Sequence, residues 1–285
     1  TLLCDNRQLA DSLNDAVLAK DLPGMADVDG SLLHFCRLVK QRHTVALCGE
    51  CADEIFGGYP WFHRREMYDG THFPWSNNLD QRGGLLKPEL RQTLGLEEYV
   101  SARLEESLSA MPTLPGETAE QVRMRQLSWL NIHWFMATLL DRKDRCSMWS
   151  GLEVRVPYAD HRIAQYVFNT PWEYKCHLGE SKSLLRDAAV GLLPAEVLHR
   201  KKSPYPKTHN PGYEALLKQR LSDVLRDSAQ PIHKLLSEET VSGLLNQTFD
   251  YGKPWFGQLM AGPQMLAYLL QINTWLLRYQ IYLDI

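Results

Sequence analysis

Hydrophobic positions recur at helical spacing along most of this chain of 285 residues. Leu9, Leu13, Ala16 and Val17 would share one face of a helix that ends near Pro23. The same periodicity predicts helices over residues 32–42, 60–67, 94–108, 118–140, 160–168, 182–190 and 264–285. The segment 118–140 is apolar almost all round, so we expect this helix to be buried.

Strand patterns are scarce. Residues 44–47 form one run of β-branched and apolar residues, which predicts a buried strand. Residues 152–156 have a second strand-like pattern. Because an α/β sheet needs several parallel strands, we predict an α/β fold that is mostly helical as it stands. Its sheet is then small, or its other strands lie outside this sequence. We treat residues 1–285 as a single domain.

Composition narrows the class of protein. A net charge of -3 gives no general attraction to nucleic acid. Polar residues interrupt the most apolar tract, 265–283, so we expect a core helix there and no membrane partner. The six cysteines do not resemble the disulfide framework of a secreted domain, and we expect reduced thiols and a cytoplasmic location.

Three carboxylates, Glu50, Asp53 and Glu54, follow the predicted strand within a few residues. Ligand sites in open α/β sheets lie at the C-terminal ends of strands. Carboxylates this close repel one another unless a cation lies between them. The pattern therefore indicates Mg²⁺ bound together with a nucleotide or pyrophosphate. The alternative is acidic residues at an ordinary helix N-terminus, and spacing alone does not separate the two.

Three further patterns each have a plainer alternative. Cys48 and Cys51 form a C-x-x-C pair, which is typical of a redox or zinc site but also of two small buried residues. The segment 141–145, predicted as a charged turn, could bind a zwitterionic amino acid or form internal salt bridges. The basic segment 200–207 could hold phosphate or be a solvated surface. The sequence contains neither G-x-x-x-x-G-K-[ST] nor G-x-G-x-x-G.

Four ordered blocks are together similar to the glutamine-hydrolysing asparagine synthetases. Residues 47–59, L-C-G-E-C-A-D-E-I-F-G-G-Y, resemble that family's S-G-E-x-[AS]-D-E-[IV]-F-G-G-Y block. Residues 144–148 and 152–161 resemble its D-R-x-S-M and L-E-V-R-V-P-F-L-D-H signature. Residues 179–186 and 193–204 resemble the K-x-x-L-R and L-P-x-x-[VI]-x-x-R-x-K blocks that follow.

The resemblance covers the C-terminal synthetase half of that family. It implies a remnant of a PP-loop fold, of the adenine nucleotide alpha hydrolase-like, Rossmann-like type with a parallel sheet. Such a domain activates the aspartate β-carboxylate with Mg-ATP, and ammonia then displaces AMP. In the family, a preceding glutaminase domain releases that ammonia from glutamine. The phosphate-loop motif S-G-G-x-D-S is absent from this sequence, so we expect a domain truncated at its N-terminus and inactive alone.

The resemblance also implies roles for individual residues. Glu50 would lie beside the acyl-adenylate and position the attacking ammonia, and Asp53 would coordinate Mg-pyrophosphate. Lys202 would neutralise phosphate charge in the transition state. A departing pyrophosphate needs cations, and an ammonia nucleophile needs a proton acceptor.

Weaker assignments follow from the same blocks. Asp144 and Arg145 are expected in the substrate pocket, and Ser31, at a predicted helix N-terminus, would face the nucleotide or the substrate. Cys48 and Gly49 are expected to contact the nucleotide, with Cys48 standing where the family usually has serine. A thiol is a weaker hydrogen-bond partner than a hydroxyl.

Two other functions remain open at this level. A relative in the same fold, such as a β-lactam-forming synthetase, would adenylate a different carboxylate and need no ammonia. A protein of another class would be a non-catalytic helical binding domain or a thiol module that uses Cys48 and Cys51. A homodimer is a further open alternative, and the expected small-molecule partners are aspartate, ATP and ammonia or glutamine.

Overall fold

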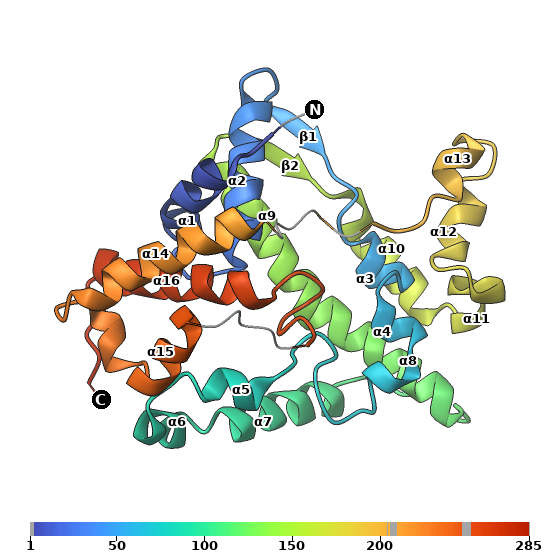
Figure 1. The fold of residues 1–285 in the computed structure, drawn as a ribbon. Coiled ribbons are helices and arrows are strands. Elements are labelled where there is room, and N and C mark those ends of the chain that lie inside the picture. Colours follow the sequence, from blue (N-terminus) through green and yellow to red (C-terminus); the bar gives the residue numbers. More distant parts are fainter. Residues whose placement is uncertain (1–2, 204, 206–209, 247–251, 285) are drawn as a thin grey trace.

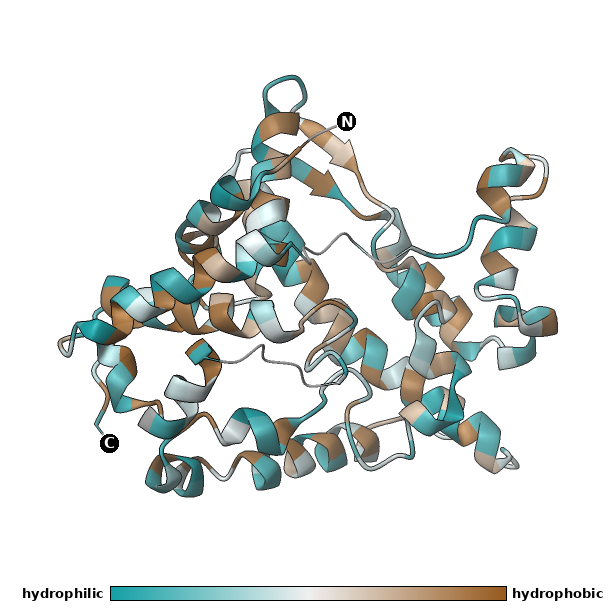
Figure 2. Cartoon of the chain, viewed as in Figure 1, coloured by the Kyte–Doolittle hydropathy of each residue, from teal (hydrophilic) through white to brown (hydrophobic). Residues whose placement is uncertain are grey.

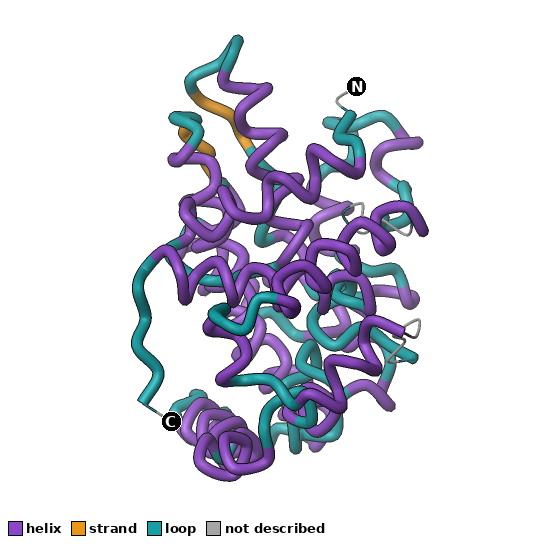
Figure 3. Tube along the Cα trace, turned by 60° about the vertical axis from the view of Figure 1, so that its left-hand side comes forward, coloured by secondary structure: helices purple, strands orange, loops and turns teal. Residues whose placement is uncertain are grey.

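Helices make up most of the computed structural model, and the strands are confined to one small region at its edge (Figure 3). The structure describes residues 3–203, 205, 210–246 and 252–284. Both the predicted abundance of helix and the predicted small parallel sheet are confirmed. The chain therefore has an α/β fold in which helices dominate.

The N-terminal helices pack with the last long helices of the chain. Helix α1 (Asn6–Lys20) begins with a capping box, in which Asp5 accepts from the backbone N–H of Gln8. Helices α1 and α2 (Ala26–Lys40) contact each other along their length, and α14 (Pro211–Arg226) and α16 (Gly262–Arg278) pack against α1. These contacts place the N-terminal helices beside α14 and α16, while the chain ends marked N and C lie apart (Figure 1).

The sheet consists of two parallel strands, β1 (Val45–Leu47) and β2 (Glu153–Arg155), with Ala46 opposite Val154. Ala46 and Val154 pack on an apolar cluster that includes residues of α2 and α9. Val45 and Leu47 point to the opposite face of β1 from Ala46, and they are 40% and 76% exposed. The prediction of a buried strand is therefore wrong for that face. Figure 2 shows the hydrophobic strand β1 near the top of the molecule, beside the more hydrophilic β2.

One long helical rod crosses the molecule diagonally (Figure 1). It consists of α8 (Ala119–Leu130), the π-helical segment η2 (Asn131–Met136) and α9 (Ala137–Trp149). The rod continues beyond the predicted end at residue 140, so the expected charged turn at 141–145 is wrong. Asp141 and Arg145 are one helical turn apart and form an ion pair of 2.7 Å, which supports the helix there.

Shorter elements surround this rod. The remaining α-helices are α3 (Ala52–Phe56), α4 (Pro60–His63), α5 (Leu79–Gly83), α6 (Pro88–Leu94), α7 (Leu96–Ser109), α10 (His161–Asn169), α11 (Trp172–Lys175), α12 (Ser183–Ala188), α13 (Ala195–Leu198) and α15 (Glu238–Asn246). Short 3-10 turns are η1 (Arg65–Met67), η3 (Pro157–Ala159), η4 (His177–Gly179) and η5 (Pro231–Lys234).

An aromatic group supports the middle of the rod. Trp61 stacks on Tyr59 with ring centroids 4.5 Å apart, and both rings contact Phe135 edge-on. The indole N–H of Trp61 also donates to Asn131 at the start of η2. These contacts hold the segment after α3 against the rod. Among the described residues, none of the helices has the length and apolar character that a membrane crossing requires.

Candidate active site

A cavity of about 430 Å³ opens where β1 ends. Its wall combines the loop after β1, helix α3, two turns of α9 and the segment around residue 202. Its lining residues include Cys48, Gly49, Glu50, Asp53, Glu54, Tyr59, Arg142, Lys143 and Lys202. The loop with the three carboxylates therefore lies at the C-terminal end of a parallel strand, where ligand sites of open α/β sheets are found, and its function stays a prediction.

The backbone after β1 turns sharply to place the acidic residues. Cys51 has a left-handed conformation (φ 76°) at the start of α3, and Gly57 has a second one (φ 74°) at its end. The N–H of Gly58 then donates to the carbonyl of Asp53 over 2.8 Å. A Cβ at Gly58 would lie 1.8 Å from Oδ1 of Asp53, so this position needs glycine.

Asp53 lies between two lysines. Its Oδ1 is 2.9 Å from Nζ of Lys182, and its Oδ2 is 3.1 Å from Nζ of Lys202. Burial alone would raise the pKa of the Asp53 carboxyl, but the two ammonium groups outweigh burial and lower this pKa below its ordinary value. Nζ of Lys202 also lies 3.6 Å from the centre of the Tyr59 ring. Two cations thus converge on one carboxylate in the cavity.

Glu54 is the most buried carboxylate of the loop, with 1% of its surface exposed. Burial raises the pKa of Glu54 to about 7, although a hydrogen bond donated by the Tyr59 hydroxyl opposes the shift. The negative charge of Asp53 next to it contributes to this raised pKa. Glu54 is therefore poised between its protonated and ionised forms near neutral pH.

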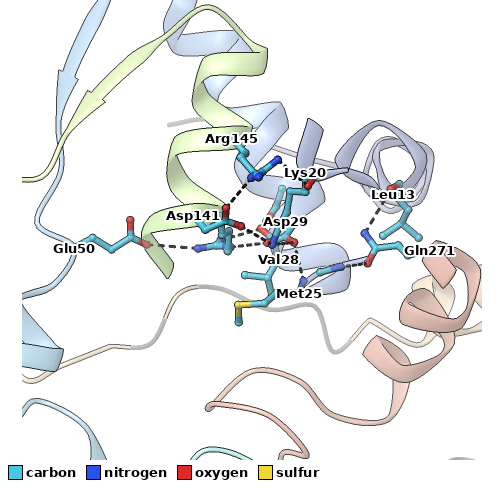
Figure 4. Close-up of polar contacts among 12 residues, drawn as sticks. Leu13, Lys20, Met25, Val28, Asp29, Glu50, Asp141, Arg145 and Gln271 are labelled. Atoms are coloured by element: carbon cyan, nitrogen blue, oxygen red, sulfur yellow. Dashed lines mark hydrogen bonds and ion pairs between the residues drawn. The ribbon is translucent and has the colours of Figure 1, made fainter. Parts of the chain in front are cut away.

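Glu50 faces two cations of helix α9. Its Oε1 lies 3.5 Å from Nη1 of Arg142, and its Oε2 lies 3.3 Å from Nζ of Lys143. The guanidinium of Arg142 is fixed from behind, because Nε donates to Asp29 over 2.6 Å and Nη2 donates to the carbonyl of Val28. Figure 4 shows Glu50 reaching across to this group.

Asp29 anchors the group behind Arg142. It has no exposed side-chain surface, and it also pairs with Lys20 over 3.6 Å and accepts from the N–H of Met25 over 2.7 Å. Gln271 of α16 joins the same region by accepting from the N–H of Gly24 over 3.2 Å (Figure 4). A buried charge needs such partners to remain ionised. The position of Glu50 is thus tied to α1, α2 and α16.

Five of the predicted site residues line this cavity, namely Cys48, Gly49, Glu50, Asp53 and Lys202. Ser31 does not line it, and the prediction that it begins a helix is wrong, because it lies inside α2. Its hydroxyl lies 3.2 Å from that of Tyr205, which does line the cavity. The roles implied by the resemblance remain predictions.

Asp144 and Arg145 are not among the residues that line the cavity. Asp144 is exposed, and Arg145 pairs with Asp141 and, over 3.1 Å, with Asp21. Their place in the substrate pocket is therefore not supported by the geometry of this helix. Successive residues of a helix point in different directions, and here Arg142 and Lys143 line the cavity while Asp144 and Arg145 do not.

The basic segment 200–207 reaches the cavity through Lys202, Ser203 and Tyr205. Residues 204 and 206–207 lie outside the described part of the chain. Lys202 is paired with Asp53, whereas Arg200 and Lys201 are exposed, so the solvated-surface alternative fits those two residues and phosphate binding stays a prediction.

The C-x-x-C pair shows no sign of redox chemistry. Cys48 and Cys51 are both free thiols. Burial, together with the nearby carboxylates of Glu54 and Glu50, raises the pKa of the Cys51 thiol to about 12. A thiol with this pKa is protonated at neutral pH and is a poor nucleophile. The geometry favours the plainer interpretation of two small residues packed in a turn.

The sequence patterns assigned no individual role to Lys182, Arg142 or Lys143. Lys182 and Arg142 lie far from residues 50–54 in the sequence, and only folding brings them to the carboxylates. Lys143 belongs to the charged segment 141–145, which was predicted as a turn. Its direction toward Glu50 follows only once that segment is known to be part of helix α9. Lys182 stands in the K-x-x-L-R block, which was a usable signal. Glu54 was identified as one of the three carboxylates after the strand, but its burial was not predicted.

A protein-only metal centre is not seen in the part of the chain that the structure describes, where no three acidic, histidine or cysteine side chains meet. Asp53 is the candidate Mg²⁺ ligand, and its oxygens are held by lysines. Mg²⁺ is commonly bound by one or two carboxylates together with substrate phosphates and water. The donor set therefore fits a metal that arrives with a nucleotide.

Comparison with known proteins identifies the family of the chain. The asparagine synthase family profile matches residues 1–277. The chain is 50% identical to asparagine synthetase [glutamine-hydrolyzing] 3 of Bacillus subtilis over 279 residues, which is 98% of this chain and 45% of that protein. It is 29% identical to asparagine synthetase [glutamine-hydrolyzing] 1 of the same organism over 64% of this chain and 34% of that protein.

The chain thus spans less than half the length of each of these relatives. The family match covers nearly all of its residues and includes the loop with Glu50 and Asp53 as well as Lys202. On this match, the chain belongs to the asparagine synthase family.

Proposed function

We propose that this chain carries the ATP-dependent step of asparagine synthesis, as the ligase part of a protein that uses aspartate, Mg-ATP and ammonia. The observation that carries the proposal is that Asp53, paired with Lys182 and Lys202, lines the same cavity as Lys202 and Glu50 at the end of β1. The fold is then that of a PP-loop synthetase domain. The relatives' names add glutamine hydrolysis as the source of ammonia.

The first chemical step is adenylation. An oxygen of the aspartate β-carboxylate bonds to the α-phosphorus of ATP, and the bond from this phosphorus to the bridging oxygen of pyrophosphate breaks. Lys182 and Lys202 offset the negative charge that pyrophosphate gains, which lowers the barrier by electrostatic stabilisation. Asp53 orients both ammonium groups. Mg²⁺, when bound, would shield the phosphate oxygens, with Asp53 as its protein ligand.

The second step is amide formation. Ammonia bonds to the acyl carbon, the bond between that carbon and the AMP oxygen breaks, and asparagine and AMP result. The attacking nitrogen loses a proton, which Glu50 accepts or passes to water. Arg142 and Lys143 hold the Glu50 carboxylate in place through ion pairs of 3.5 and 3.3 Å. A fixed acceptor costs less reorganisation in the transition state than a mobile one.

The test follows the release of AMP and pyrophosphate by the natural protein that contains these residues, with Mg-ATP, ammonia and a panel of carboxylates. We expect release that depends on aspartate and yields asparagine. Release with another carboxylate and without ammonia would instead favour a β-lactam-forming type of synthetase. Absence of any release would refute a ligase function. The 285 residues alone should form no asparagine, because S-G-G-x-D-S is absent from their sequence.

A variant locates the chemistry in the described cavity. Lys202→Ala should lower the rate by about 10²–10³, the scale for losing one transition-state contact. Lys201→Ala is the matched control, since Lys201 is the exposed neighbour in the same segment and should leave the rate within about twofold. A Lys202→Ala loss below about tenfold would remove Lys202 from the mechanism.

A further inference from the structure

A second cavity, of about 280 Å³, lies between α8 and α11. The loop 114–117 and the segment after α10 complete its wall. It shares no lining residue with the cavity around Asp53. The proposed ligase chemistry makes no use of it.

Lys175 is the unusual residue of this second cavity. It is 3% exposed and lines the cavity from the last turn of α11. Within the described residues, its ammonium group forms no ion pair or hydrogen bond. Burial, and to a lesser extent the charge of Arg125, lower the pKa of Lys175 to about 8. At neutral pH the group is still mostly cationic, and a buried cation without a counter-ion is costly.

The other charges of the cavity cancel each other. Arg125 pairs with Glu117 over 2.7 Å, and each side chain is 10% exposed. The guanidinium of Arg125 also lies 5.3 Å from the centre of the Phe168 ring. Glu117 is thus already committed to Arg125, and the positive charge of Lys175 is left uncompensated.

The rest of the wall is flat and partly apolar. Phe168 and Trp172 contribute aromatic surface, and Met124 adds apolar surface. Trp172 is fixed by stacking on Phe62, with ring centroids 5.6 Å apart and planes inclined by 11°. Ser128 and Thr170 offer hydroxyl groups. Small-molecule sites characteristically combine an apolar wall with a few polar groups that set orientation.

We propose that this second cavity is a binding site for a small organic anion, in which Lys175 pairs with the ligand's carboxylate and the aromatic wall holds its flat apolar body. The anion supplies the counter-charge that the protein does not. The cavity is small, so the ligand has few atoms beyond one ring. This site is separate from the proposed aspartate and ATP cavity.

Benzoate tests the proposal, with benzamide as a neutral molecule of the same shape. Titration calorimetry at pH 7 on the intact chain should show saturable binding of benzoate. Benzamide should bind at least about tenfold more weakly, because a hydrogen bond to a charged group contributes about 1.5–3 kcal/mol. Absence of saturable benzoate binding, or equal binding of the two molecules, would overturn the proposal.

Variants place the bound anion. Lys175→Met keeps the buried stem and removes the charge, and should weaken benzoate by at least about tenfold. Lys202→Met removes a cation from the other cavity and should change the affinity by less than about twofold. Loss of binding in Lys202→Met with retention in Lys175→Met would assign benzoate to the Asp53 cavity and refute the second site.

A measurement on the unaltered chain covers the case in which Lys175→Met does not fold. Acetylation of individual lysines by a small water-soluble reagent at pH 8 is followed by mass spectrometry. Benzoate should slow modification of Lys175, and benzamide should not, whereas modification of Lys40 on α2 should be unaffected by either. Equal rates for Lys175 with and without saturating benzoate would contradict a direct ion pair.

Discussion

Glu54 offers a direct test of the electrostatics of the candidate active site. Its carboxyl group is almost completely buried, and the Tyr59 hydroxyl donates a hydrogen bond to Oε1. The substitution Glu54→Gln keeps the side-chain length and a carbonyl oxygen that can accept from Tyr59. It removes only the ability to ionise, so the variant isolates the energetic effect of the charge.

The size of the effect follows from the raised pKa. The pKa of Glu54 rises from 4.5 to about 7, chiefly through burial. The folded state therefore holds its proton in the pH range where the unfolded state has lost it, and the free energy of unfolding falls as pH rises from about 4.5 to 7. At 1.36 kcal/mol per pKa unit, the wild-type chain loses about 3 kcal/mol by pH 8, and Glu54→Gln does not.

Urea unfolding monitored by tryptophan fluorescence at pH 5, 6, 7 and 8 measures this difference. We expect the variant to be increasingly more stable than the wild-type chain as pH rises, with the gap levelling off above pH 7. Glu66→Gln, at an exposed carboxylate, is the control and should leave the pH profile unchanged. Parallel profiles for the wild-type chain and Glu54→Gln would refute the inference that Glu54 titrates near neutrality.

Three further substitutions or treatments test other parts of the structure. Asp29→Asn leaves the buried guanidinium of Arg142 without its carboxylate, so the free energy of unfolding in urea should fall by about 3–5 kcal/mol. A decrease below about 1 kcal/mol would contradict a buried ion pair. Gly58→Ala forces its Cβ into Oδ1 of Asp53, and AMP release should fall by about 10²-fold while circular dichroism is unchanged; normal activity would show that Asp53 can move. Treatment of the native chain with a thiol reagent at pH 8 should leave Cys51 unmodified, as judged by peptide mass spectrometry. Rapid modification of Cys51 would contradict the raised pKa of its thiol.

Local patterns predicted the position of the candidate site well. The apolar run that stops before Glu50 and Asp53 indicated a strand with acids at its C-terminal end, and β1 ends there. The periodicity of residues 9–17 likewise predicted α1. In both cases the signal lies within a few neighbouring residues, which is the range over which hydrophobic spacing is informative.

Contacts between side chains that are far apart in the sequence lie outside the range of such local patterns. Lys182 meets Asp53 across more than a hundred residues, and no spacing rule relates two such positions. The exposure of Leu47 was missed because a β-branched run indicates a strand but not how many faces are covered. Ser31 was placed at a helix start because serine favours caps, yet the apolar face of α2 begins earlier.

The π-helical segment at residues 131–136 has a consequence for the geometry of the whole rod. A π-helical turn closes with one residue more than an α-helical turn, and each residue of an α-helix turns the chain by about 100°. The segment therefore sets the rotation of α9 about its own axis relative to α8. An unbroken α-helix of the same sequence would point Arg142 away from Asp29 and Glu50, so the direction of this guanidinium is set about two helical turns before Arg142.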